Sequence, residues 1–257
     1  MKLTFLGTGT STGVPQIGCD CEVCRSTDPR DKRLRCSALL QTADGRGILI
    51  DCGPDFRTQI LEAGSPSVDA VLLSHIHYDH VGGIDDLRPY SYREGGLPVY
   101  CRRDVAQTLR ANMPYAFLDN PKAGVPHLHV REIRELIPET VCGAVFMPLA
   151  VSHGSLDILG FRFGNLAYIT DCKTMPRETL DRLRGVDTLV INALRQTDHL
   201  THMNLQDALR VIKMTAPRRA YLTHLSHQMG RHAEVEPTLP PGVAIAYDRL
   251  SVEIPEN

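Results

Sequence analysis

Long apolar runs and an excess of charge of one sign are both missing from this 257-residue sequence. No apolar run approaches the ~20 residues that cross a membrane, and residues 2–6 predict a strand rather than the apolar part of a signal peptide. We therefore expect a cytoplasmic protein with no membrane partner. The net charge of -2 supplies no basic field for a long nucleic acid, so we do not expect one as a partner.

A phosphate-binding P-loop is absent as well. Residues 7–13 form a glycine-rich stretch, but it lacks the Gly-Lys-Ser/Thr ending of that motif. Its backbone N–H groups could still approach a phosphate, and a plain turn explains the same residues equally well. No stretch has the composition of a linker, so we expect one domain over residues 1–257, with 42% hydrophobic residues to build its core.

Short apolar or alternating runs predict many strands and fewer helices. The predicted strands are 2–6, 36–41, 47–50, 68–74, 97–101, 127–130, 144–151, 166–170, 188–193, 218–223, and one or two edge strands within 243–254. Helices are predicted after Asp55 with a stop at Gly64, over 104–112 with Asp104 as the cap, and over about 204–215. This alternation is typical of the α/β class.

The sequence is, in contrast, rich in residues that can bind metal, with eight cysteines and 11 histidines. Without an export signal, metal binding or catalysis explains the cysteines better than disulfides do. His75, His77, Asp79 and His80 follow the apolar run 68–74, so a buried strand delivers them at its carboxyl end, where α/β proteins bind ligands. A polar loop facing solvent is the competing interpretation. A metal ion explains the cluster better, because imidazole and carboxylate are usual ligands of Zn, Mn and Fe.

Other ligand-type residues also end apolar runs, namely His153, Asp171 and His224. Asp51 follows a strand too, where it could orient a metal-binding histidine or cap the next turn. Cys172 is adjacent to Asp171, and we expect its side chain to point away from its neighbour's into the core.

The motif from His75 to His80, followed by Gly82-Gly83, resembles the metal motif of the metallo-β-lactamase superfamily. The resemblance implies an αββα sandwich of two mixed β-sheets flanked by helices. It also implies two divalent metals, Mn, Zn or Fe, between the sheet edges. The implied ligands are His75, His77 and His153 for one ion, Asp79, His80 and His224 for the other, and Asp171 as the bridge.

Cys19, Cys21 and Cys24 form a second cluster, within a polar loop at about 18–36. Thiols this close together make a compact chelate for a soft ion, and we expect structural zinc. The fourth ligand must come from elsewhere in the chain. A redox dithiol of Cys21 and Cys24 is the alternative, although no thioredoxin-like frame surrounds it.

A closer resemblance covers nearly the whole chain. The glycine-rich loop, the cysteine cluster and the stretch Thr223-His224-Leu225-Ser226-His227-Gln228 together resemble the phosphoribosyl cyclic phosphodiesterases of the carbon–phosphorus lyase pathway. This resemblance implies that His227 completes the structural zinc site, and it is the only indication of a homodimer.

The same resemblance implies a phosphate-contacting general acid, and His202 occupies its position in an H-x-x-L context. Asn204 departs from the acidic residue expected before Leu205, so His199 stays open as a substitute for His202.

We therefore predict a dinuclear-metal phosphodiesterase that hydrolyses a small cyclic diester such as phosphoribosyl 1,2-cyclic phosphate. A metal-bridging hydroxide would attack phosphorus, with His202 and Asp79 as catalytic residues. One alternative is a tRNA 3′-processing endoribonuclease, although the basic Gly/Pro-rich arm of those enzymes is not visible here. Another is a thioester or lactone hydrolase. A non-catalytic zinc or thiol sensor would leave the predicted dinuclear site unexplained.

Overall fold

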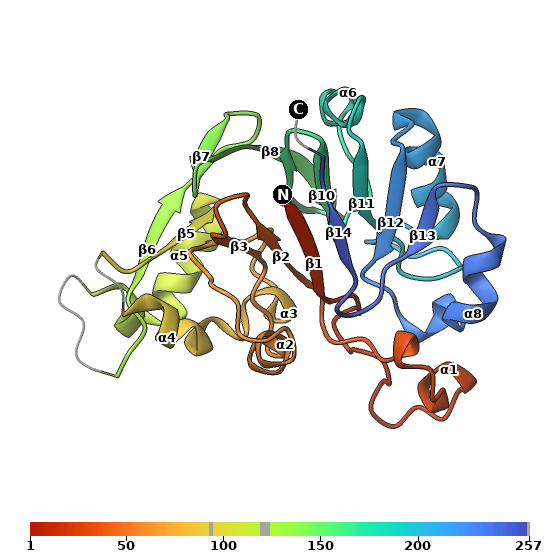
Figure 1. Ribbon diagram of the computed structural model, residues 1–257, viewed down its shortest axis with the longest axis horizontal. Coiled ribbons are helices and arrows are strands. Elements are labelled where there is room, and N and C mark those ends of the chain that lie inside the picture. The colour runs from red at the N-terminus through yellow and green to blue at the C-terminus, as the bar shows by residue number, and fades with distance from the viewer. Residues whose placement is uncertain (93–94, 119–123, 256–257) are drawn as a thin grey trace.

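Two β-sheets packed face to face form the centre of the protein in the computed structural model, and helices lie on both outer sides (Figure 1). The structure describes residues 1–92, 95–118 and 124–255. Each sheet has seven strands. The arrangement is the αββα sandwich predicted from the resemblance, and that prediction is confirmed.

The first sheet has the strand order β14-β1-β2-β3-β4-β5-β6. Its strands are β1 (Lys2–Gly7), β2 (Ser37–Gln41), β3 (Gly47–Ile50), β4 (Ala70–Leu72), β5 (Leu97–Cys101), β6 (Leu128–Glu132) and β14 (Ser251–Glu253). Pairs from β14 to β3 are antiparallel, and pairs from β3 to β6 are parallel. The carboxyl ends of β3 and β4 therefore meet at the same edge of this sheet.

The second sheet repeats this plan in the order β13-β12-β11-β10-β9-β8-β7. Its strands are β7 (Glu139–Val141), β8 (Ala144–His153), β9 (Leu156–Phe163), β10 (Leu166–Ile169), β11 (Thr188–Asn192), β12 (Arg219–Thr223) and β13 (Val243–Ile245). Pairs from β7 to β10 are antiparallel, and pairs from β10 to β13 are parallel.

Helices cover the outer face of each sheet. The first sheet packs against α2 (Phe56–Glu62) and α5 (Arg103–Asn112), and the second against α6 (Arg177–Leu183) and α7 (Leu205–Thr215). The shorter helices are α1 (Glu22–Arg25), α3 (Tyr78–Val81), α4 (Arg88–Ser91) and α8 (His232–Val235). None of the helices in the described ranges is long and apolar enough to cross a membrane.

Alternating side chains in the strands explain how each sheet is buried on both faces. In β3, Ile48 and Ile50 belong to the core between the sheets, whereas Leu49 belongs to the core under α2 and α5. The second sheet contributes Phe146 and Phe161 to the central core, and their ring centroids are 6.2 Å apart. The apolar runs of the sequence lack a clean polar alternation because both faces of these strands are covered.

Most predicted elements are confirmed, and the differences occur at their ends. Asp104 does not cap α5, which begins at Arg103 after Arg102; the Asp104 carboxylate accepts a hydrogen bond from Arg102 Nε at 3.0 Å instead. The predicted strand 144–151 continues to His153 because β8 and β9 form one long hairpin. The edge strands within 243–254 belong to different sheets, β13 to the second and β14 to the first.

Candidate metal centre

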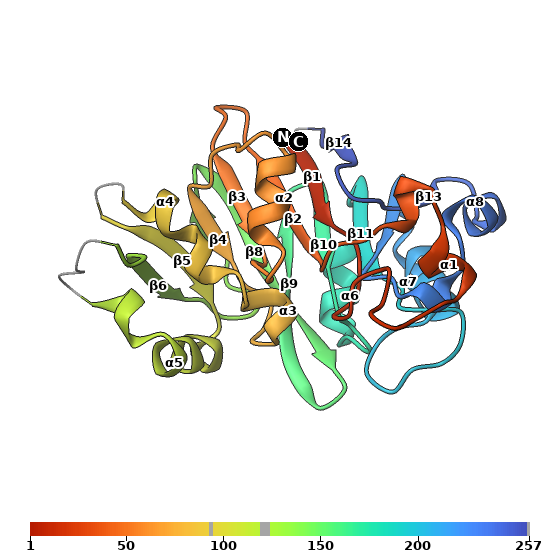
Figure 2. The ribbon, with the colours of Figure 1, turned by 90° about the horizontal axis from the view of Figure 1, so that it is seen from below.

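Four ligand-type side chains converge where the carboxyl ends of strands from both sheets meet. Potential ligand atoms of Asp79, His80, Asp171 and His224 all lie within 4.8 Å of one another. Asp79 and His80 come from α3 after β4, Asp171 follows β10, and His224 follows β12. All four residues are buried, with 8%, 0%, 2% and 1% of their surface exposed. Figure 2 views the molecule from below Figure 1 and shows α3 beside the turn that joins β8 and β9.

The charges of this group suit a divalent cation. Burial would raise the pKa of Asp171, but His224 and His80 hold it well below its usual value. Burial likewise opposes ionisation of Asp79, yet His80 lowers its pKa. Two buried carboxylates therefore stay ionised side by side, which is costly unless positive charge compensates them.

His80 shows how that compensation is arranged. Burial would lower the pKa of His80, but Asp171 and Asp51 raise it well above its ordinary value. Its Nε2 lies 3.2 Å from Asp79 Oδ2 and from Asp171 Oδ2, yet it is buried without an aligned hydrogen bond. A divalent ion at the two carboxylates would displace the proton from this nitrogen, because metals bind neutral imidazole, so the residues fit a divalent ion.

A second group lies beside the first and shares Asp171. It contains His153, Asp171 and His202, whose potential ligand atoms are also within 4.8 Å of one another. The predicted ligands His75 and His77 adjoin this group but are not members of it. His75 Nε2 is 3.0 Å from His77 Nδ1, and the ring centroids of His77 and His153 are 5.2 Å apart. Asp171 thus occupies the central position that the sequence predicted for a bridging residue.

Unusual backbone conformations mark the strand ends at this centre. Asp51, Asp171 and His224 have φ angles of 59°, 54° and 56°, in the left-handed region that residues other than glycine seldom adopt. Each directly follows or nearly follows a strand, namely β3, β10 and β12. Strain of this kind collects at functional sites, where the surrounding structure holds it in place.

Asp51 orients the histidines rather than capping a turn. Its Oδ2 lies 2.7 Å from His80 Nδ1, and its carboxylate also accepts hydrogen bonds from the backbone N–H and hydroxyl of Ser74. Ser74 Oγ is in turn 2.9 Å from His75 Nδ1. A carboxylate on the far nitrogen of a histidine fixes the ring and directs the other nitrogen at a metal.

Hydroxyl side chains that the sequence did not single out complete the surroundings. Thr10 Oγ1 is 3.2 Å from His224 Nε2, and Thr170 Oγ1 donates to Asp171 Oδ2 at 2.5 Å. The backbone carbonyl of Thr201 lies 2.8 Å from His153 Nδ1. Serine and threonine are common throughout the chain, so no pattern distinguishes these three. Thr10 shows that the glycine-rich loop packs directly against the centre.

His202 faces the centre, and His199 lies behind it. His202 Nε2 is 3.0 Å from Asp171 Oδ1, whereas its Nδ1 is 3.2 Å from His199 Nδ1. Asn204 is the N-cap of α7, and its side chain forms a capping box with Asp207. Asn204, which replaces the acidic residue expected from the family resemblance, therefore affects the start of α7 and does not displace His202.

The cysteine cluster forms a separate site. Ligand atoms of Cys19, Cys21, Cys24 and His227 lie within 4.8 Å of one another, and His227 Nδ1 is 3.4 Å from Cys19 Sγ and 3.2 Å from Cys21 Sγ. Hydrogen bonds, chiefly from the Cys24 backbone N–H and then from His227, lower the pKa of Cys21 to about 6. The lowered pKa favours the thiolate of Cys21, the form that binds zinc, whereas burial raises the pKa of Cys24 to about 11.

Hydrogen bonds connect the cysteine site to the loop that carries His202. Arg195 Nη1 donates to Gln228 Oε1 at 3.0 Å, and Gln196 Nε2 donates to the carbonyl oxygen of Met229 at 2.9 Å. Gln228 directly follows His227 in the chain. The position of the loop before α7 therefore depends on the same short turn that supplies a ligand to the cysteine site.

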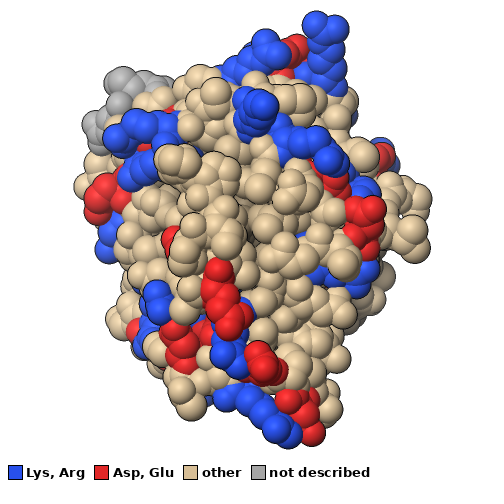
Figure 3. Space-filling model, turned by 90° about the vertical axis from the view of Figure 1, so that its right-hand side faces the viewer, with Lys and Arg blue, Asp and Glu red and all other residues tan. Residues whose placement is uncertain are grey.

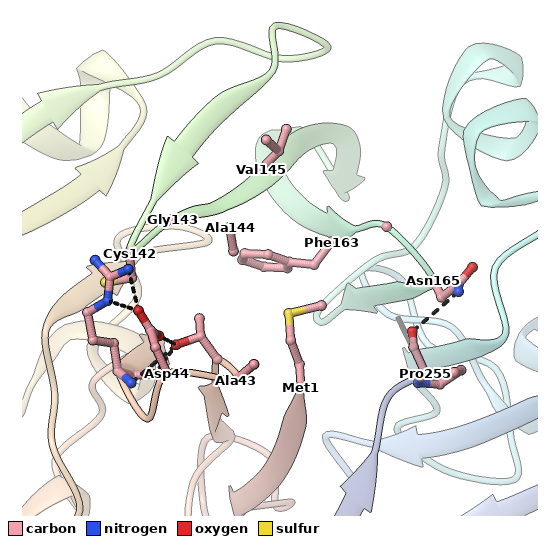
Figure 4. Close-up of a pocket in the computed structure, with 13 residues that line it drawn as sticks. Met1, Ala43, Asp44, Cys142, Gly143, Ala144, Val145, Phe163, Asn165 and Pro255 are labelled. Carbon is pink, nitrogen blue, oxygen red and sulfur yellow. Dashed lines mark hydrogen bonds and ion pairs between the residues drawn. The ribbon is translucent and has the colours of Figure 1, made fainter. Parts of the chain in front are cut away.

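Two sequence expectations away from these sites can also be examined. Cys172 is fully buried and its Sγ donates to the carbonyl oxygen of Thr174, so it belongs to the core as predicted. A cavity of about 530 Å³ lies at the opposite end of the sheets and contains no predicted site residue (Figure 4). Met1, Cys142, Phe163 and Pro255 surround it.

Comparisons with known proteins agree with this fold and site. Residues 46–225 match the family model described as the beta-lactamase superfamily domain. A solved structure of a new diphosphatase from the PhnP family is 39% identical, with a TM-score of 0.90 and coverage of 98% of this chain and 96% of that one. Human tRNase Z, short form (ELAC1), has a TM-score of 0.72 over 100% of both chains, but at 19% identity it shows the fold alone.

A curated relative is longer than this chain. The octanoyltransferase of Porphyromonas gingivalis (strain ATCC BAA-308 / W83) is 43% identical over 258 residues, which cover 100% of this chain and 52% of that protein. The chain thus spans about half the length of this relative.

The family model places this chain in the metallo-β-lactamase superfamily, and its buried His/Asp centre has residues that fit divalent metal ions. Within that superfamily the chain belongs to the PhnP family, as the similarity along nearly its whole length to a solved member shows.

Replacing Asp51 tests how far the metal centre depends on its support. In Asp51→Asn one carboxylate oxygen becomes an amide nitrogen, which cannot accept a hydrogen bond, so Ser74 and His80 can no longer both be held. We expect Mn²⁺ affinity to fall about 10- to 100-fold in a titration followed by electron paramagnetic resonance. Asp44→Asn, in the exposed turn between β2 and β3, is the control and should bind as the parent does. Unchanged affinity in Asp51→Asn would contradict this role.

A cysteine substitution tests the second site. We expect Cys24→Ser to lose one equivalent of zinc in elemental analysis and to unfold more readily in urea. A ligand present at 100 times its dissociation constant stabilises the folded state by about 2.7 kcal/mol, which sets the scale of the loss. Cys142→Ser, half-buried at the other end of the sheets, should retain the zinc. Equal zinc content in the two variants would rule out the assigned ligands.

Proposed function

We propose that this hydrolase cleaves a small cyclic phosphodiester such as 5-phosphoribosyl 1,2-cyclic phosphate. The observation that carries the proposal is the pair of adjoining His/Asp groups that share the buried carboxylate of Asp171. The similarity to a PhnP-family diphosphatase supports a phosphate substrate. The particular diester comes from the family resemblance of the sequence.

Two metals are part of the proposal. His75, His77 and His153 would hold one, Asp79, His80 and His224 the other, and Asp171 would contact both. When bound, two divalent ions supply Lewis acidity at phosphorus and a water of lowered pKa as the nucleophile. Asp79 has its catalytic role through this site, because its carboxylate lies against His80 at the position where the second ion would be held.

His202 would deliver the proton to the departing sugar oxygen. Asp171 is ionised and can only accept a hydrogen bond, so the nitrogen 3.0 Å away, His202 Nε2, must carry the hydrogen. The same N–H can turn to a substrate oxygen placed over the centre. His199 is poorly placed for that step, because its Nδ1 lies on the far side of the His202 ring.

The cysteine site would hold structural zinc through Cys19, Cys21, Cys24 and His227, within a loop of the single domain formed by residues 1–257. Its hydrogen bonds to the 195–196 segment give that zinc a part in placing His202. This arrangement favours a structural ion over a zinc or thiol sensor, which would not need the dinuclear centre.

A tRNA-processing nuclease is less well supported. The face shown in Figure 3 has acidic and basic side chains around its margin and mostly uncharged ones in its middle. On this face the basic side chains are interrupted by acidic and uncharged ones and form no continuous track for a long polyanion. A homodimer and a cytoplasmic location remain parts of the proposal that rest on the sequence.

The direct test is phosphorus NMR of 5-phosphoribosyl 1,2-cyclic phosphate with the Mn-loaded protein. We expect the wild type to open the ring and His77→Ala to leave it closed, because loss of one imidazole weakens metal binding at an exposed edge of the centre. Elemental analysis of both proteins accompanies the assay. An intact ring with occupied metal sites would exclude this substrate and direct the search to other diesters, RNA ends, lactones and thioesters.

The role of His202 has its own test. His202→Ala should lower kcat by about 10²- to 10⁴-fold, the usual contribution of a general acid. Metal content should not change, because the proposal assigns His75 and His77, not His202, to the ion held by His153. A loss of metal in His202→Ala would make His202 a ligand instead, since it lies in the group with His153 and Asp171. A substrate with a good leaving group, such as a p-nitrophenyl diester, should recover most of the loss because it needs no protonation. His199→Ala is the matched control, and a larger kcat loss there than in His202→Ala would reverse the assignment.

A further inference from the structure

A positively charged pocket of about 620 Å³ lies outside the metal centre. It is formed by the 29–34 segment, the 247–249 segment and the end of α2. Four cationic side chains and two carboxylates are among its lining residues, namely Arg30, Lys32, Arg33, Arg249, Glu62 and Asp248. None of them belongs to a candidate metal group.

Arg33 is the unusual member, because it is a buried cation without an ion-pair partner. Only 5% of its surface is exposed. Its Nη1 donates to Thr8 Oγ1 at 2.9 Å and to the carbonyl oxygen of Ala246 at 2.6 Å. Among the described residues, these are the hydrogen bonds of the guanidinium, so Nε and Nη2 make none, and it has no ion pair with a carboxylate within 4.0 Å. The nearest buried carboxylate, Asp248, is reached only through the Thr8 hydroxyl, so the guanidinium has a charge neighbour but no direct ion pair.

The two carboxylates at the pocket do not form that ion pair. Asp248 Oδ1 accepts from the backbone N–H and hydroxyl of Thr8, and its Oδ2 accepts from Leu34 N. Glu62 is exposed at the end of α2. Burial lowers the pKa of Arg33 only to about 10, with Asp248 opposing the shift, so the guanidinium stays charged at neutral pH.

The other cations add to the positive field. Arg30 is paired with Asp28, whose Oδ2 lies 2.7 Å from its Nη2. Lys32 and Arg249 are exposed, and neither makes an ion pair within the described residues. Lys32 Nζ donates to the carbonyl oxygen of Cys24 at 3.2 Å, so Lys32 and Arg249 line the pocket as cations without a carboxylate partner among the described residues.

We propose that this pocket binds a phosphorylated small molecule about the size of a nucleoside monophosphate. The free Nε and Nη2 of Arg33 form a planar fork that matches two phosphate oxygens. Lys32 and Arg249 contribute charge at the entrance. Tyr247 lines the pocket and supplies an aromatic wall; its ring meets that of His232 edge to face at 82°, with centroids 5.7 Å apart. The volume lies within the range of small-molecule sites.

The pocket is separate from the metal centre but connected to it by a short segment. Arg33 contacts Thr8, and Thr10 contacts His224. The backbone N–H of Thr10 also donates to the carbonyl oxygen of Leu225. Thr8, which contacts Arg33, is therefore only two residues from Thr10, which contacts the metal centre.

Calorimetric titration with adenosine 5′-monophosphate tests the proposal. We expect saturable binding to the wild-type protein, weakened about tenfold or more in the double variant Lys32→Glu/Arg249→Glu. Arg177→Glu/Arg184→Glu, which reverses two exposed charges on and beside α6, is the matched control and should bind as the wild type does. His77→Ala should also retain binding, because its metal centre is altered but its pocket is not.

Amide hydrogen exchange then locates the ligand, with protection expected at 29–34 and 247–249. The proposal is overturned if neither adenosine monophosphate nor inorganic phosphate binds, if the pocket variant binds as tightly as the control, or if His77→Ala alone abolishes binding. The last result would place the ligand on the metal centre instead. Both charge variants alter exposed side chains, so folding should survive, and circular dichroism verifies it.

Discussion

The carboxylate of Asp171, buried between imidazoles from distant parts of the chain, is the contact on which the centre depends. Its Oδ1 lies 3.0 Å from His202 Nε2 and 3.1 Å from His224 Nε2, and its Oδ2 lies 3.2 Å from His80 Nε2. Only 2% of its surface is exposed, so water cannot solvate its charge. An ionised group in this position requires positive charge around it, and both the histidines and the divalent ions of this superfamily meet that requirement.

The topology of the two sheets makes this convergence possible. Each sheet changes from antiparallel to parallel pairing, at β3 in the first and at β10 in the second. Asp51 and Asp171 follow these two strands with left-handed backbone. Asp51 contacts His80, and Asp171 belongs to both candidate metal groups, so corresponding strand ends supply two carboxylates to one centre.

The rest of the site depends on a few connections between loops. The turn that carries His227 also holds Arg195 and Gln196 through Gln228 and Met229. The glycine-rich loop packs its Thr10 against His224 from the other side. The turn at 227–229 therefore holds the 195–196 segment, and the glycine-rich loop contacts His224, although these segments are far apart in the sequence.

Local chemistry made part of this site visible in the sequence. The residues from His75 to His80 are adjacent in the chain and follow an apolar strand, so their proximity does not depend on the fold. The three cysteines within 19–24 were visible for the same reason. The fold class followed from the resemblance that these motifs carry. The start of α5 was placed one residue too late, because neighbouring residues compete to be the N-cap and the sequence does not show which one caps the helix.

Without the tertiary structure, some contacts could not be assigned. Asp51 had two roles open, and its 2.7 Å contact with His80 decides between them. The sequence also left open whether His202 or His199 lies next to Asp171, and it did not reveal the environment of Arg33. Both depend on loops whose positions are determined by packing across both sheets. By itself the sequence determined which residues can bind metal and which short segments bring them together. Only the folded chain decided which of them face one another, because burial and long-range contacts set the partners of each side chain.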